Sequence, residues 1–193
     1  MEPLLVGYGT LLNRASLGHS IGANAASDKP LRPVIVEGFR RLFDLRPDHY
    51  VPITSCKLGV PGIENAAMNV EPDPTARFNA LAFPTTEVEL AALDERERYY
   101  LRISRPVIDF ASGETIGEGH FYAATADAPG IERDPSRLMP LWRDVVWARE
   151  GAYAISEAFG RMFDATTFLA DGTTRVVDRY ADLLGDTSDV PRP

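Results

Sequence analysis

The strands predicted for this chain come in runs and do not alternate with helices. Six segments are predicted as strands, at residues 4–6, 34–45, 66–70, 78–83, 99–109 and 119–124. Turn residues Pro72-Asp73-Pro74 separate the strands at 66–70 and 78–83, and one predicted helix, at 86–97, interrupts the series. Apolar residues then recur at three- and four-residue steps from Leu141 to Phe163, which predicts a long C-terminal helix, and a shorter helix is expected at 175–184. This order favours an α+β fold over a doubly wound parallel sheet.

The length of the chain suits a single domain. With 193 residues, 45% of them hydrophobic and 25% charged, it can bury a core without disulfides or metals. We expect one domain over residues 1–185 and a frayed tail at 186–193. The single cysteine, Cys56, excludes an internal disulfide and fits a reducing compartment.

Charge and hydropathy exclude several classes of partner. The formal net charge is −8 and no block of five or more Lys or Arg residues occurs, so we expect neither nucleic acid nor an anionic membrane as a partner. No apolar run approaches the ~18 residues of a membrane span. The first residues lack the basic and apolar regions of a signal peptide, which makes the cytoplasm the expected location.

A carboxylate in the predicted helix at 86–97 occupies an unusual position. Thr86 and Glu89 have the spacing of a capping box, which sets the start of the helix. Leu90, Leu93 and Glu97 then follow at i, i+3 and i+7, on the face expected to meet the core. Burial there would raise the pKa of Glu97 above its reference of about 4.3 and suit it to proton transfer. The alternative is a structural ion pair with a neighbouring arginine.

The first predicted strand leads into Gly7-Tyr8-Gly9-Thr10-Leu11. Two glycines around one tyrosine allow a sharp turn that exposes consecutive backbone N–H groups, which can hold a carboxylate or a phosphate. Alone, the pattern also fits an ordinary tight turn. It is not a dinucleotide fingerprint, because Leu12 stands where the third glycine is required.

Four segments in this order resemble the γ-glutamylcyclotransferase-like family. That family has a Tyr-Gly-Ser/Thr-Leu loop, a strand with Val-x-Gly-Tyr/Phe-x-x-x-Phe, and a Leu-Asp-x-x-Glu helix that ends in the catalytic glutamate. The corresponding segments here are residues 6–11, 36–43, 79–83 and 93–97. The resemblance covers roughly residues 4–124 and implies a small mixed β-barrel or strongly curved sheet with peripheral helices.

Carried over by motif, the resemblance assigns roles to six residues. Glu97 would be the general acid/base, and the substrate-binding residues would be Tyr8, Gly9, Thr10, Leu11 and Tyr122. The sequence departs from the family after the glutamate, where Arg98-Tyr99-Tyr100 replaces a glycine-containing stretch. This departure leaves the identity of the leaving amine open.

The implied reaction closes a γ-glutamyl compound into 5-oxoproline and releases an amine, so the expected partner is a small-molecule γ-glutamyl substrate. It requires no cofactor, metal or covalent nucleophile. His19, His49 and His120 are scattered and have no spacing typical of a zinc site. Two alternatives remain: a non-catalytic sensor of small carboxylates, and an amide hydrolase that uses the same glutamate to activate water.

Two adjacent arginines in the predicted strand at 34–45 complete the set of candidates. Successive side chains of a strand point to opposite faces, so at most one of Arg40 and Arg41 can face a substrate carboxylate.

Overall fold

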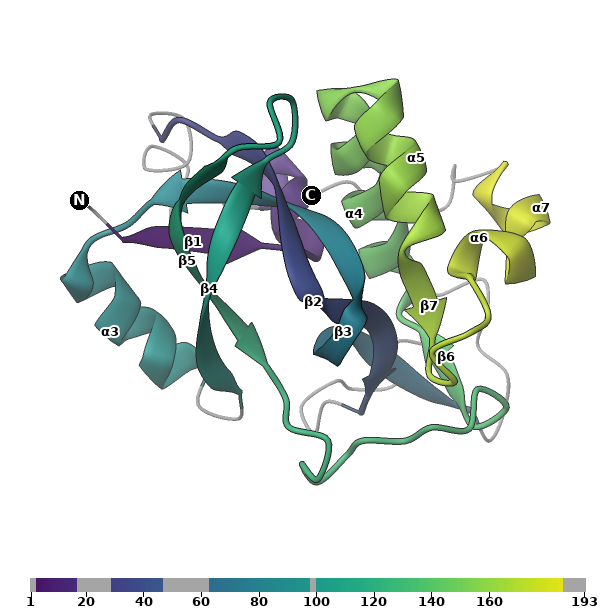
Figure 1. Cartoon of the computed structure of the whole chain (residues 1–193). Coiled ribbons are helices and arrows are strands. Elements are labelled where there is room, and N and C mark those ends of the chain that lie inside the picture. The colour runs from purple at the N-terminus through teal and green to yellow at the C-terminus, as the bar shows by residue number, and fades with distance from the viewer. Residues whose placement is uncertain (1–2, 17–28, 47–62, 98–99, 186–193) are drawn as a thin grey trace.

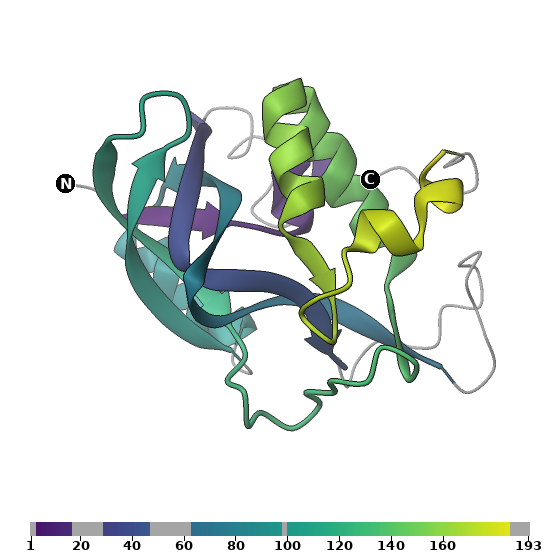
Figure 2. The same ribbon diagram turned by 45° about the vertical axis from the view of Figure 1, so that its right-hand side comes forward.

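The computed structural model describes residues 3–16, 29–46, 63–97 and 100–185, apart from the side chain of Arg96. Figure 1 shows a β-barrel with helices on its outside, and Figure 2 shows the same arrangement after a turn of 45°. The expected frayed tail at 186–193 lies outside the described residues, as do His19, His49, Cys56, Arg98 and Tyr99.

Five strands close the barrel: β1 (Leu4–Gly7), β2 (Arg32–Leu45), β3 (Glu64–Pro84), β4 (Leu101–Asp109) and β5 (Thr115–Ala123). Their order is β3-β1-β5-β4-β2, and a further pairing of β2 with β3 completes the circle. β1 and β5 run parallel, while the other neighbours in the barrel are antiparallel. The predicted α+β class, with a mixed barrel and peripheral helices, is confirmed.

Short strands and helices surround the barrel. β6 (Leu138–Pro140) pairs with β3, and β7 (Thr167–Leu169) pairs with β2, both in parallel. α3 (Glu87–Arg96) lies at one side of the barrel, and α4 (Trp142–Ile155) and α5 (Glu157–Ala165) lie together at another (Figure 1). No helix among the described residues has both the length and the apolar character that crossing a bilayer requires.

A bulge interrupts the pairing of the two long strands β2 and β3. The register changes from Glu37–Arg77 to Phe39–Pro72, so residues 73–76 oppose Gly38 alone. Gly38 has a φ of 82°, which favours glycine. The predicted strands at 66–70 and 78–83 are therefore parts of one strand and not a pair separated by a turn.

The apolar periodicity of the C-terminal region continues through a break in the backbone. The expected long helix is two helices, α4 and α5, separated at Ser156, whose side chain accepts a hydrogen bond from the N–H of Phe159. The expected helix at 175–184 is likewise two short helices, α6 (Val176–Arg179) and α7 (Ala181–Leu184).

Aromatic rings fill the barrel. Phe39, Phe78 and Phe121 are buried there and meet edge to face, with ring centroids 5.1 Å apart for Phe39–Phe121 and 6.2 Å for Phe78–Phe121. Tyr8 adds its ring to this group from the end of β1, 5.8 Å from Phe78. The core of the barrel thus supports the residue that begins the glycine-containing loop.

Candidate active site

The loop after β1 turns sharply and leaves backbone N–H groups without partners in the turn. At Gly7 a Cβ atom would lie 2.6 Å from the Leu11 Cβ, so glycine is needed for the chain to fold back. A 3-10 turn, η1 (Thr10–Leu12), follows, and its first hydrogen bond runs from the N–H of Leu12 to the carbonyl oxygen of Gly9. The N–H groups of Gly9, Thr10 and Leu11 precede that bond and therefore have no acceptor within the turn.

The helix α3 begins at the predicted capping box. Thr86 accepts from the N–H of Glu89, and the Glu89 carboxylate accepts from the N–H of Thr86 at 2.8 Å. Leu90 is buried and Leu93 is half-buried on the face toward the barrel. Glu97 caps the C-terminal end, where its N–H donates to the carbonyl oxygen of Leu93, and its side chain is half-buried. Glu97 therefore ends the apolar face at its border with a cavity.

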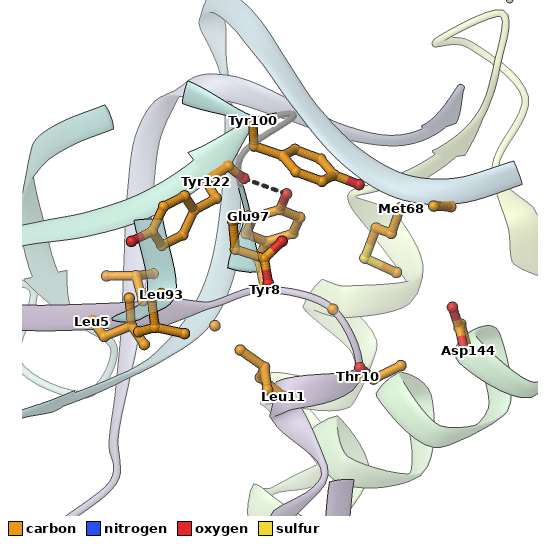
Figure 3. A pocket seen from close by; sticks show the side chains of 14 residues that line it. Leu5, Tyr8, Thr10, Leu11, Met68, Leu93, Glu97, Tyr100, Tyr122 and Asp144 are labelled. Atoms are coloured by element: carbon orange, nitrogen blue, oxygen red, sulfur yellow. Dashed lines mark hydrogen bonds between the residues drawn. The ribbon is translucent and has the colours of Figure 1, made fainter. Parts of the chain in front are cut away.

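The loop and Glu97 line one cavity of about 180 Å³. This is smaller than the roughly 300–1,000 Å³ of sites for drug-sized ligands, so it suits a small molecule. Its described lining is Leu5, Val6, Gly7, Tyr8, Gly9, Thr10, Leu11, Ala67, Met68, Leu93, Glu97, Tyr100, Tyr122 and Asp144. All six residues to which the sequence analysis gave a role are among them. Figure 3 shows Glu97 and Tyr8 above Leu11, with Asp144 beyond Thr10.

Two tyrosines connect the parts of the cavity wall. The hydroxyl of Tyr8 donates to the backbone carbonyl oxygen of Tyr122 at 2.6 Å, and the hydroxyl of Tyr122 donates to Asp94 of α3 at 2.8 Å (Figure 3 shows the first bond). The loop, β5 and the helix that carries Glu97 are thereby joined.

The tyrosine hydroxyls of the cavity are held in their neutral form. Burial, with the nearby Tyr100 hydroxyl and the Glu97 carboxylate, raises the pKa of Tyr8 well above 10. Burial and then the charge of Glu97 raise the pKa of Tyr100 to about 12. Burial and the hydrogen bond to Asp94 raise the pKa of Tyr122. At neutral pH the three phenols can donate hydrogen bonds but cannot act as bases.

Several solved structures have a similar fold. A γ-glutamyl cyclotransferase superposes with a TM-score of 0.60 at 13% identity, over 96% of this chain and 99% of that chain. The uncharacterized protein loc79017 from Homo sapiens gives 0.57 at 12% identity over 96% and 99%, and YkqA from Bacillus subtilis gives 0.55 at 13% over 83% and 52%. The chain has the γ-glutamyl cyclotransferase-like fold. No known family profile matches the sequence, and no curated protein matches it.

In this γ-glutamyl cyclotransferase-like barrel, three further cavity residues were not singled out from the sequence. Tyr100 follows Glu97 closely, and its N–H donates to the Glu97 carbonyl oxygen at 2.7 Å. Met68 comes from β3, and Asp144 comes from the first turn of α4. In the sequence, Tyr100 was noted only as part of the departure from the family pattern after Glu97. The periodicity of α4 gave no signal for Asp144, whose position depends on where that helix packs.

Of the three histidines considered from the sequence, the structure describes only His120, and it is not part of the cavity lining. His120 lies on β5, and its Nδ1 is 2.6 Å from the Ser104 hydroxyl across the strand pair, away from the described cavity lining. Among the described residues, no three His, Cys, Asp or Glu side chains gather in a way that would hold a metal ion.

Proposed function

We propose that the protein is a γ-glutamylcyclotransferase that converts a γ-glutamyl compound into 5-oxoproline and an amine. The observation that carries the proposal is the shared cavity. Glu97 and the Tyr8–Leu11 loop are far apart in the sequence, yet they line the same small space. The fold that the chain shares with a γ-glutamyl cyclotransferase supports it.

The proposed chemistry divides the substrate between the two features. The N–H groups of Gly9, Thr10 and Leu11 bind the α-carboxylate, and Glu97 faces the α-amine and the γ-carbonyl group. The amine nitrogen attacks the γ-carbon and forms the lactam C–N bond, while Glu97 accepts its proton. As the original γ-amide C–N bond breaks, Glu97 returns that proton to the departing nitrogen. No proton is gained or lost overall.

The magnitudes fit a site with few chemical groups. Ring closure joins two parts of one molecule, so holding the substrate folded can supply much of the rate enhancement. A positioned acid/base adds a further ~10²–10⁴-fold. Because Tyr8, Tyr100 and Tyr122 stay protonated at neutral pH, the proton-accepting groups of the described lining are the carboxylates of Glu97 and Asp144. Glu97 is the one that ends the helix of the family pattern.

The assay is incubation of the purified protein with a panel of γ-glutamyl amides, followed by mass spectrometry of the products. The panel holds the glutamyl half constant and varies the amine, from amino acids to peptides, diamines and amino sugars. Formation of 5-oxoproline from any of them supports the proposal. Release of glutamate instead identifies an amide hydrolase. Saturable binding with no product identifies a carboxylate sensor and overturns the assignment.

A further inference from the structure

A fully buried arginine lies behind the loop and does not line the cavity. Arg41, on β2, has no exposed surface, whereas its neighbour Arg40 is partly exposed and paired with Asp73. Of the two arginines considered from the sequence, Arg41 is therefore the one that points inward. Burial lowers its pKa to about 9, which still leaves it cationic at neutral pH.

Every hydrogen bond of Arg41 in the described structure goes to a neutral acceptor. Its Nη1 donates to the carbonyl oxygens of Asn79 at 2.8 Å and Tyr8 at 3.2 Å. The other acceptors are the Asn79 Oδ1, the hydroxyls of Thr166 and Thr167, and the Phe163 carbonyl oxygen, at 2.9–3.5 Å. The nearby carboxylate of Asp164 is itself bound by Arg149 and Tyr153.

The contact with Tyr8 determines the direction of a backbone dipole. Tyr8 C=O and Gly9 N–H belong to one trans peptide unit and point in opposite directions. Because the oxygen is held by Arg41, the N–H of Gly9 points to the other side of the loop. A cation bound to the oxygen also polarises the peptide and strengthens its N–H as a donor.

A buried cation that no carboxylate binds directly is costly, and the nearby charge of Asp164 and the ring of Phe163, 4.2 Å from its Cζ, offset only part of that cost. We propose that Arg41 is a positioning residue for anion binding: it orients the Tyr8–Gly9 peptide and gives the loop a positive potential that a bound carboxylate completes. This inference rests on the proposed function only in that the loop binds the carboxylate of the ligand.

The test measures the preference of the site for charge. Wild-type protein, R41M and R41K are titrated calorimetrically with 5-oxo-L-proline and with its uncharged amide, pyroglutamamide. The wild type should bind the carboxylate about tenfold more tightly than the amide, as expected for a hydrogen bond to a charged group. R41M should lose most of that preference, and R41K should keep more of it. In turnover, R41M should raise KM more than it lowers kcat, because the carboxylate is held equally before and during ring closure.

A purely structural role predicts a different result. If Arg41 only ties β2 to α5, R41M weakens both ligands equally, and this outcome overturns the proposal. T167V is the matched control: it removes the acceptor of the Arg41 Nε at 3.0 Å, on the side away from Tyr8, and should leave the preference intact.

Two further measurements keep the inference independent of folding and of the assigned reaction. If R41M does not fold, the ¹⁵N-coupled side-chain signals of Arg41 in the wild type should shift with 5-oxo-L-proline and not with pyroglutamamide; no difference between the two overturns the proposal. A wild type that prefers the carboxylate but turns over no γ-glutamyl amide retains the role of Arg41 and loses the proposed function. A wild type that turns over a γ-glutamyl amide but does not prefer the carboxylate retains the proposed function and loses the role of Arg41.

Discussion

The hydroxyl of Tyr8 donates a 2.6 Å hydrogen bond to the backbone carbonyl oxygen of Tyr122, a residue 114 positions away. Tyr8 begins the loop that we propose binds the carboxylate, and Tyr122 reaches from β5 to Asp94 on the helix that ends at Glu97. The relative position of loop and acid therefore depends on two phenols that hold three elements together.

Tyr8→Phe should weaken this connection without removing the chemistry. Losing one hydrogen bond costs about 1 kcal/mol, or ~2–4 °C in Tm for a domain of this size. Because the Tyr8 pKa lies well above 10, the hydroxyl is not a base, and kcat/KM should fall less than tenfold with no change in the shape of the pH profile from pH 6 to 9. Thermal melts and pH–rate profiles check both. A loss as large as that of a Glu97 variant would make Tyr8 a direct participant.

Glu97→Gln should remove proton transfer and leave ligand binding. The amide has nearly the same shape but cannot accept and return a proton, so turnover should fall by ~10²–10⁴-fold while the affinity for 5-oxo-L-proline stays within a few-fold. The matched control is Glu95→Gln, on the exposed side of the same helix, which should turn over like the wild type. Equal activity of the two variants would exclude Glu97 from the reaction.

The local signals of the site were readable in the sequence because each depends on nearby residues. The capping box of Thr86 and Glu89 sets the phase of α3 and hence the direction of Glu97. The glycine at position 7 is required by Leu11, four residues on. Met68 and Asp144 were different, since only the closed barrel and the packing of α4 bring them to the cavity. The sequence also left open which of Arg40 and Arg41 points inward, which the closed barrel decides.

The class of the fold was predictable from the sequence, but the break between two helices and the bulge in a strand were not. The apolar stripe of the C-terminal region reads as one helix because Ala152 and Phe159 are buried on either side of the break at Ser156, so burial periodicity does not register the kink. Pro72 and Pro74 read as a turn, but prolines are tolerated at a bulge, where ladder hydrogen bonds are already interrupted.

Gly151→Ala should displace the loop through its supporting helix. A Cβ atom at Gly151 would lie 2.5 Å from the carbonyl carbon and oxygen of Leu12, and backbone cannot move aside as a side-chain tip can. We expect a loss of ~1–3 kcal/mol of unfolding free energy and a higher KM. Gly185→Ala is the control, because among the described residues its Cβ would meet only the Asp182 carbonyl oxygen at 3.5 Å, with helical backbone angles that suit alanine. Urea titrations compare the two, and equal stability would show that α4 does not rest on the loop.

Asp44→Asn should change the pH dependence of stability. Burial, with a smaller effect of the Glu71 charge, raises the pKa of Asp44 to about 6 despite Arg133, whose Nη1 lies 3.0 Å away, and the nearby Asn69 amide. The folded pKa lies above the unfolded value of about 3.9, so the folded state holds a proton that the unfolded chain has lost. The Asp44 contribution is therefore complete below pH ~4 and is lost as the pH rises through 6, by about 3 kcal/mol.

Urea unfolding of wild type and Asp44→Asn at several pH values from 4.5 to 7.5 isolates this contribution. The wild-type free energy minus that of the variant should decrease as the pH rises, because asparagine does not titrate. Asp134→Asn is the control: hydrogen bonds from Ser136 lower the pKa of that exposed carboxylate, so it titrates below about pH 4 and its difference should stay constant over this range. A difference for Asp44 that stays constant across the range would mean that its charge is fully compensated by Arg133.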